Sequence, residues 1–192
     1  MENEIEFLEP FSQEEKDVIY QYKTAEDEFA YQLNAYLRGN IVYSPPSPVW
    51  ICHLDSAIKK CRTTKEITLY RATCSEDFDR FIRNNIFMDP AFVSTSLNEN
   101  SLSTFFNSMD SKNPIKLVIS CPSGANMIDM ELEDDSDKSE NEILLPRCSH
   151  YKIKNCFTII DKTKIVNEIK TSIMNPFNDY IELKIYEVKL VV

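Results

Sequence analysis

The chain has 192 residues, 43% of them hydrophobic and 11% aromatic, which is the composition of a folded domain and argues against a disordered chain. Its 21 Lys and Arg residues are outnumbered by 31 Asp and Glu residues, giving a net charge of −10. This balance disfavours a broad nucleic-acid surface and disfavours binding to anionic membranes. Two glycines are too few for a glycine-rich phosphate loop or a dinucleotide fingerprint, so any nucleotide must be bound in another way.

Membrane, export and metal signals are weak in this sequence. No stretch approaches the roughly 18 apolar residues of a membrane span, and the acidic N-terminus lacks the apolar core of a signal peptide. We therefore expect a cytosolic protein or an effector injected into a host cytosol, with export by a route without a cleaved signal left open. The six cysteines include no C-x-x-C pair and the two histidines, His53 and His150, lie far apart. We expect free thiols and no metal.

The first third of the chain predicts helices. Residues Ser12–Arg38 are expected to form one helix, because Ser12 and Glu15 fit a capping box, apolar residues recur at helical spacing and Gly39 follows as a stop. Three prolines in the segment YSPPSPVW predict a linker loop over positions 43–50, since proline neither continues a helix nor pairs in a central strand. A short helix is expected at about His53–Cys61.

The remainder of the chain changes to the alternating pattern of strands. In the last strand the apolar positions change phase between Ile185 and Tyr186, which predicts a β-bulge near Ile185. Helices followed by strands indicate the α+β class, and the long irregular connections suggest a two-sheet β-sandwich with the helices beside it. We expect one domain over residues 1–192, helical at about 12–62 and mainly β at about 66–192. The expected strands are Ile67–Arg71, Phe92–Ser96, Ile115–Cys121, Ile143–Leu145, Tyr151–Ile160 and Tyr180–Val192.

Three sets of polar residues lie in or beside these apolar strands. Arg71 ends the first strand, Ser94–Ser96 lie in the second, and Glu140 and Glu142 precede the fourth. Taken singly, each has an ordinary explanation: a strand-end arginine is usually exposed, a Ser-Thr-Ser strand is usually half-exposed, and glutamates at i and i+2 usually both face water. Their order along the chain is more informative than any one of them.

An arginine strand, a Ser-Thr-Ser strand and a Glu-x-Glu pair in this order resemble the catalytic set of the mono-ADP-ribosyltransferases of the arginine–serine–glutamate type. The segment HLDSAIKKCRTTKEITLYRA is similar to that family's helix and arginine strand, and FVSTSL to its serine strand. CPSGANMID followed by ENEILLPRCSHYKI is similar to its last conserved stretch, and QLNAYLR resembles the helix that supplies an Asn and an Arg to the NAD pocket. The resemblance extends from about Asp17 to the C-terminus. It implies an ADP-ribosyltransferase-like sandwich fold and NAD as co-substrate.

The resemblance also implies how the donor is held. Arg71 would bind the diphosphate of NAD as a bidentate guanidinium, with Arg38 as a second phosphate contact and Asn34 as a polar anchor. Loss of nicotinamide leaves a ribosyl cation, which the Glu142 carboxylate would stabilise while accepting a hydrogen bond from the ribose 2′-hydroxyl. Ser94 would orient this glutamate.

Further residues are assigned to the nicotinamide end of the pocket. Ala72, at a position where the family usually has glycine, would offer its backbone groups to the nicotinamide amide. Thr95 belongs to the serine strand and is assigned to the NAD pocket with it. Phe106, or else Phe105, is expected to pack on the nicotinamide ring, and Lys112 would replace an arginine that the family often has in this segment.

Glu140 concerns the acceptor. It matches the first glutamate of the family's Glu-x-Glu form, which resembles the arginine-modifying branch, and a guanidinium is a poor nucleophile until a base removes or orients its proton. The acidic residues before Glu140 form either a solvated charge run or a surface that attracts a basic, arginine-containing protein. These residues are Asp129, Glu131, Glu133, Asp134, Asp135 and Asp137.

The leading prediction is therefore an NAD-dependent mono-ADP-ribosyltransferase of the toxin or effector kind, acting on a protein, with arginine as the expected acceptor. Two alternatives remain. The first is an NAD glycohydrolase, in which water takes the ribosyl group. The second is a non-catalytic binding module on the same scaffold, which the presence of all four residues Arg71, Ser94, Glu140 and Glu142 disfavours.

Overall fold

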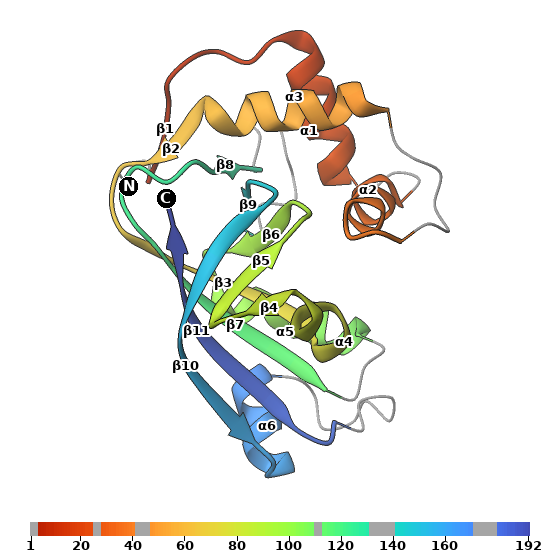
Figure 1. Cartoon of the computed structure of the whole chain (residues 1–192), viewed down its shortest axis with the longest axis vertical. Coiled ribbons are helices and arrows are strands. Elements are labelled where there is room, and N and C mark those ends of the chain that lie inside the picture. Colours follow the sequence, from red (N-terminus) through yellow and green to blue (C-terminus); the bar gives the residue numbers. More distant parts are fainter. Residues whose placement is uncertain (1–3, 25–27, 41–46, 110–112, 131–140, 171–179) are drawn as a thin grey trace.

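The computed structural model describes residues 4–24, 28–40, 47–109, 113–130, 141–170 and 180–192. Helices α1 (Gln13–Thr24), α2 (Phe29–Leu37) and α3 (Pro48–Lys59) gather at one end of the molecule, and α6 (Lys162–Ile169) lies at the opposite end (Figure 1). Among the described helices, none combines the length and the apolar character that crossing a bilayer requires.

The helix expected over Ser12–Arg38 is two helices, so this prediction is wrong in its middle. The capping box is confirmed: the Ser12 N–H donates to Glu15 Oε2 at 2.7 Å, and the Glu15 N–H donates to Ser12 Oγ at 3.3 Å. Glu28, however, has φ 57°, a left-handed conformation that a helix interior cannot contain, and α2 starts after it. Gly39, with φ 85°, follows the end of α2 as expected.

Helix α3 begins five residues earlier than the start expected at about His53. Pro48 occupies its first turn, where a backbone N–H is not needed, so the proline starts the helix instead of belonging to the linker. Pro45 and Pro46 lie outside the described residues. Leu54, Ala57 and Ile58 are buried at helical spacing and pack α3 onto the core.

All six expected strands are present with slightly different ends, and the α+β class is confirmed. The short strands β1, β2, β4, β5 and β8 are not predicted by the sequence pattern. The strand bounds are β1 Ile5–Phe7, β2 Cys61–Thr63, β3 Ile67–Cys74, β4 Ile82–Arg83, β5 Ile86–Asp89, β6 Val93–Ser96, β7 Pro114–Cys121, β8 Ile128–Asp129, β9 Glu142–Leu145, β10 Ser149–Ile159 and β11 Leu183–Val191. Within the described residues, β1 pairs with β2, and the other nine strands form one sheet in the order β4-β5-β10-β11-β7-β3-β6-β9-β8.

The pairing in this sheet is weakest between β3 and β6. Strands β3 and β7 pair along eight positions, from Ile67 opposite Cys121 to Cys74 opposite Pro114. On its other side, β3 pairs with β6 only at Tyr70 and Ser96. The two strands therefore separate immediately beyond this pair, next to Arg71 and Ser94.

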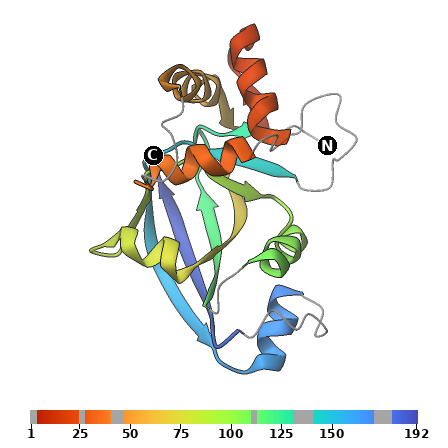
Figure 2. The ribbon, with the colours of Figure 1, turned by 90° about the vertical axis from the view of Figure 1, so that its right-hand side faces the viewer.

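The central strands are covered on both faces. Helix α4 (Ser75–Phe78) packs on one face, and α5 (Leu102–Ser108) and α6 pack on the other (Figure 2). This explains why the bulge expected near Ile185 is wrong: Ile185 packs toward α5 and α6, while Tyr186 packs toward the α4 side. Both phases of β11 find apolar cover, so no face change is needed. The register shift lies in the neighbouring β10, between Ile153 and Asn155.

Candidate active site

A cleft lies beside the junction of β3 and β6, between α1, α2 and α5. It has two adjoining parts, with volumes of about 470 Å³ and about 510 Å³. Tyr70, Ala72, Thr95, Ser96 and Glu142 line the first part, and Asn34, Arg38, Asp77 and Arg80 line the second. Tyr22, Ala30, Arg71, Ser94 and Phe105 line both, so they mark the boundary between the two parts.

Arg71 lies at this boundary, with no carboxylate partner among the residues that the structure describes. Its Nη1 donates to the Ser94 carbonyl at 2.6 Å, which ties β3 to β6 where their ladder has ended. Burial lowers the pKa of Arg71, and the charge of nearby Arg38 lowers it further. Arg38 and Arg80 each have a carboxylate within 4.0 Å, but no described carboxylate lies that close to Arg71. An unpaired guanidinium in a cleft favours an anionic ligand.

The register of β6 and β9 brings the serine strand and the glutamate together. Ser96 lies opposite Glu142, and side chains alternate along a strand, so Ser94, Ser96 and Glu142 share one face. Thr95 is buried, and its hydroxyl donates to the Ile143 carbonyl at 2.7 Å, which secures β6 to β9. This register places Ser94 and Glu142 on the face of the sheet that lines the first part of the cleft.

A hydrogen-bonded chain leads to Ser94 from the helices. Asn34 Nδ2 donates to the Tyr22 hydroxyl at 2.6 Å, and that hydroxyl lies 3.4 Å from Ser94 Oγ. An amide nitrogen only donates, so the Tyr22 oxygen accepts from Asn34 and its own proton is available for Ser94. Burial raises the pKa of Tyr22, the bonds to Ser94 and Asn34 oppose this, and the charge of Glu142 adds to it. Tyr22 was not expected in the site, because its position on the apolar face of α1 indicates a core residue.

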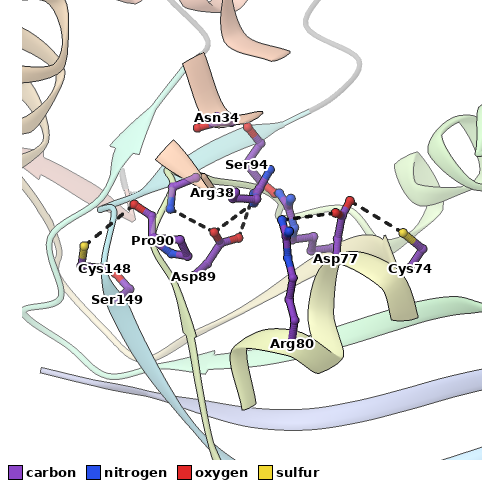
Figure 3. Close-up of polar contacts among 12 residues, drawn as sticks. Asn34, Arg38, Cys74, Asp77, Arg80, Asp89, Pro90, Ser94, Cys148 and Ser149 are labelled. Atoms are coloured by element: carbon purple, nitrogen blue, oxygen red, sulfur yellow. Dashed lines mark hydrogen bonds and ion pairs between the residues drawn. The ribbon is translucent and has the colours of Figure 1, made fainter. Parts of the chain in front are cut away.

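Arg38 is held by a carboxylate that the sequence did not indicate. Its Nε and Nη2 donate to the two oxygens of Asp89 at 3.0 Å and 2.8 Å (Figure 3). Burial lowers the pKa of Arg38, but the hydrogen bonds and charge of Asp89 outweigh this and raise it. Asp89 also accepts the Ala91 N–H at 3.0 Å. This bond forms an Asx turn, for which an Asp before a proline is a common start, but the dipeptide does not indicate an ion pair with Arg38.

A sequence profile of one known family, the ADP-ribosyltransferase exoenzymes, matches residues 1–175. The chain belongs to this family. Its members are enzymes that transfer ADP-ribose from NAD to proteins, so the predicted arginine–serine–glutamate family and the enzyme class are confirmed. Among curated protein sequences, none matches the chain.

Solved structures of several ADP-ribosyltransferases have a similar fold. Plx2a, an ADP-ribosyltransferase toxin from Paenibacillus larvae, has 19% identity and a TM-score of 0.62, with 95% of this chain and 88% of that chain covered. C3stau2 from S. aureus, solved with NAD, has 17% identity and a TM-score of 0.63, with 94% and 88% covered. The ADP-ribosyltransferase Vis in complex with agmatine has 17% identity and a TM-score of 0.62, with 97% and 78% covered.

The structure distinguishes the two aromatic residues considered for the nicotinamide ring. Phe106 is fully buried, packs in the cluster that joins α5 to α6, and accepts a hydrogen bond from Tyr180 at its carbonyl, so it does not line the cleft. Phe105 is 45% exposed and lines both parts of the cleft. Successive helix residues point about 100° apart, so only one of the two can face the ligand. The prediction that Phe106 lies in the pocket is therefore wrong, and Phe105 is the one of the two that lines the cleft.

Ala72 does not need the glycine that the family usually has at this position. It lies within β3, opposite Lys116 of β7, in extended backbone. It is not among the described residues with positive φ, so the Cβ of alanine causes no backbone strain.

Several predicted residues lie outside the described part of the chain. Glu140, Lys112 and the acidic residues 131–137 belong to this group, whereas Asp129 is in β8. No group of three His, Cys, Asp or Glu side chains that could hold a metal is found in the described segments. None of the six cysteines forms a disulfide.

Proposed function

We propose that the chain is a mono-ADP-ribosyltransferase that moves ADP-ribose from NAD to an arginine side chain of a protein. Family membership supplies the NAD-dependent reaction class. The assignment of the site depends on one observation: Arg71, which has no carboxylate within 4.0 Å among the described residues, lies in one cleft with Ser94 and Glu142.

The shape of the cleft supports a dinucleotide as donor. The two parts have volumes within the roughly 300–1,000 Å³ typical of small-molecule sites, and Arg71 lies where they meet. In NAD the diphosphate likewise lies between two nucleosides. We place the diphosphate at Arg71, the nicotinamide riboside near Ala72, Phe105 and Glu142, and the adenosine in the part lined by Asn34. Nη1 of Arg38 makes no bond to Asp89, so its N–H groups are available to a phosphate.

The chemistry follows from the groups around the nicotinamide riboside. The bond between ribose C1′ and the nicotinamide nitrogen breaks, and its electron pair leaves with nicotinamide. The Glu142 carboxylate stabilises the cation that forms at C1′. Because Tyr22 can donate to Ser94, the Ser94 hydroxyl can donate its own proton to Glu142 and orient it. A guanidine nitrogen of the acceptor then attacks C1′ and loses a proton to Glu140.

Two observations support arginine as the acceptor. The sequence Glu140-Asn141-Glu142 has the Glu-x-Glu form, whose first carboxylate can act as the base. Vis was solved with agmatine, a small guanidine compound. A glycohydrolase would share every donor-side step and differ only in using water, so the acceptor must be tested separately from the donor.

The two glutamates provide this test. With NAD and agmatine, Glu142→Gln should lower both nicotinamide release and ADP-ribosyl-agmatine formation by about 10²-fold or more, because it acts on the donor. Glu140→Gln should abolish transfer and leave slow NAD hydrolysis. The exposed Glu9 gives a matched control, since Glu9→Gln should change neither activity.

Each contrary outcome has a definite meaning. Full transfer by Glu140→Gln would overturn the arginine assignment. Nicotinamide release at the wild-type rate by Glu142→Gln would overturn the donor site. Release without transfer to agmatine or to any protein in the wild type would support the glycohydrolase.

A further inference from the structure

A third guanidinium reaches the part of the cleft that contains Arg38 and Arg71. Arg80 belongs to the short 3₁₀ helix η2 (Asp79–Phe81), and Figure 3 shows its side chain extending from there toward Ser94. Its side chain is 48% exposed, and its guanidinium carbon lies 4.6 Å from the centre of the Phe81 ring. Stacking on a ring orients a guanidinium without using any of its N–H donors.

The ion pair of Arg80 is much looser than that of Arg38. Arg80 Nη2 lies 3.8 Å from Asp77 Oδ1, beyond hydrogen-bond distance, whereas Arg38 is bonded to Asp89 through two hydrogen bonds. The Asp77 side chain is 56% exposed, so water can replace Arg80 at little cost. The other Asp77 oxygen accepts a weak bond from the Cys74 thiol at 3.7 Å, and burial raises the pKa of this thiol to about 11, so it stays protonated.

Among the described residues, positive charges outnumber negative charges along this part of the cleft. Three guanidiniums, those of Arg38, Arg71 and Arg80, line it with one described carboxylate, that of Asp77. Asp89 does not line this part, and it already pairs with Arg38 and accepts the Ala91 N–H. Once Asp77 turns to solvent, Arg71 and Arg80 present two positive charges. The diphosphate of a dinucleotide carries two negative charges, which these two guanidiniums can match.

We infer that Arg80 is a further donor-binding residue that moves from Asp77 to the diphosphate of NAD, and that Asp77 is its counter-ion in the empty site. The inference rests on the proposed function of the cleft. It makes Asp77 a competitor of the substrate, so changes at Asp77 and Arg80 must act on NAD affinity in opposite directions.

The test is the KM for NAD in nicotinamide release. Arg80→Met keeps the length of the side chain and should raise KM about tenfold with kcat changed less than twofold. Asp77→Asn should lower KM about two- to threefold, which is the size expected for removing a loose exposed pair. The double variant should behave like Arg80→Met. Arg83→Met is the matched control, because Arg83 is an exposed neighbour that donates to the Ile82 carbonyl and does not line the cleft.

Calorimetric binding of ADP and of adenosine provides a second measurement that needs no turnover. Arg80→Met should weaken ADP about tenfold and leave adenosine unchanged, because only ADP carries the diphosphate. Unchanged ADP binding, equal weakening of both ligands, or a higher KM in Asp77→Asn would each overturn the inference about Arg80 alone. A wild type that neither binds ADP nor releases nicotinamide would overturn the proposed function itself.

Discussion

The removal of one oxygen atom from Tyr22 tests whether the helices control the catalytic strand. Tyr22→Phe keeps the ring, whose centre lies 6.3 Å from that of Phe92, and deletes the hydroxyl between Asn34 and Ser94. The partly buried Asn34 amide loses its acceptor, so the free energy of unfolding should fall by about 1–2 kcal/mol. For a chain of this length that is about 3–6 °C in Tm.

The effect on activity follows from the direction of the hydrogen bonds. Without the Tyr22 proton, Ser94 can turn its own proton away from Glu142, and kcat for nicotinamide release should fall about five- to tenfold with little change in KM. Burial raises the pKa of Tyr22, so its proton is present throughout the neutral range, and the loss should be the same between about pH 6 and pH 9. Tyr20→Phe, on the exposed side of the same helix, is the control.

A double-variant cycle decides whether Tyr22 acts through Ser94. If the two residues form one chain, adding Ser94→Ala to Tyr22→Phe should cause no further loss of kcat. If the fold-losses in kcat of the two single variants multiply in the double variant, the hydrogen-bonded chain from Asn34 to Ser94 is refuted. A Tyr22→Phe enzyme with wild-type kcat and the expected drop in Tm would refute it as well.

Three further predictions concern other residues. Arg71→Lys keeps the charge but not the planar fork, so KM for NAD should rise about ten- to a hundredfold with an unchanged circular dichroism spectrum; a wild-type KM would remove Arg71 from the donor site. Lys116 is 3% exposed and pairs with Glu99 at 2.5 Å and Glu168 at 2.6 Å. Either carboxylate can neutralise Lys116, so Glu99→Gln or Glu168→Gln alone should lower the free energy of unfolding in urea by about 1 kcal/mol. The double variant leaves the buried charge unpaired and should lower it by about 3–5 kcal/mol. A double variant whose loss equals the sum of the two single losses would contradict this. Burial raises the pKa of Glu15, but its hydrogen bonds from a lysine and a serine outweigh this and lower it below the ordinary 4.5. The contribution of the Glu15 carboxylate to the free energy of unfolding is therefore fully present above pH 4.5 and is lost as the pH falls through its lowered pKa. The Tm of Glu15→Gln should accordingly fall less on acidification than the Tm of the wild type.

The grouping of the site residues was predictable, because it depends on strand alternation and on the order of motifs. Arg71, Ser94 and Glu142 line one cleft as expected. Their partners were not predictable in the same way. Asp89 lies 51 positions from Arg38, and no local pattern indicates that the two side chains bond to each other. Tyr22 lies on the apolar face of α1, which indicates a core residue. The role of its hydroxyl is visible only from the tertiary contact with Ser94.

The errors in the fold have a common physical origin. The helical pattern continues on both sides of Glu28, so periodicity alone cannot locate a break that depends on one left-handed residue. The apolar pair Ile185 and Tyr186 suggested a bulge because the strand was assumed to bury only one of its faces. In the structure apolar residues pack on both faces of β11. Phe105 and Phe106 are equally apolar, and the orientation of α5 alone decides which one lines the cleft.

The separation of β3 from β6 has a consequence for solubility. Where two strands part, their open backbone groups form an edge that could pair with a strand of another chain and start aggregation. Here that edge opens into the cleft, and Arg71 occupies the Ser94 carbonyl. Arg71 therefore also blocks part of an open strand edge. Variants that empty this region, and above all those that shorten Arg71, should be examined for self-association as well as for lost activity.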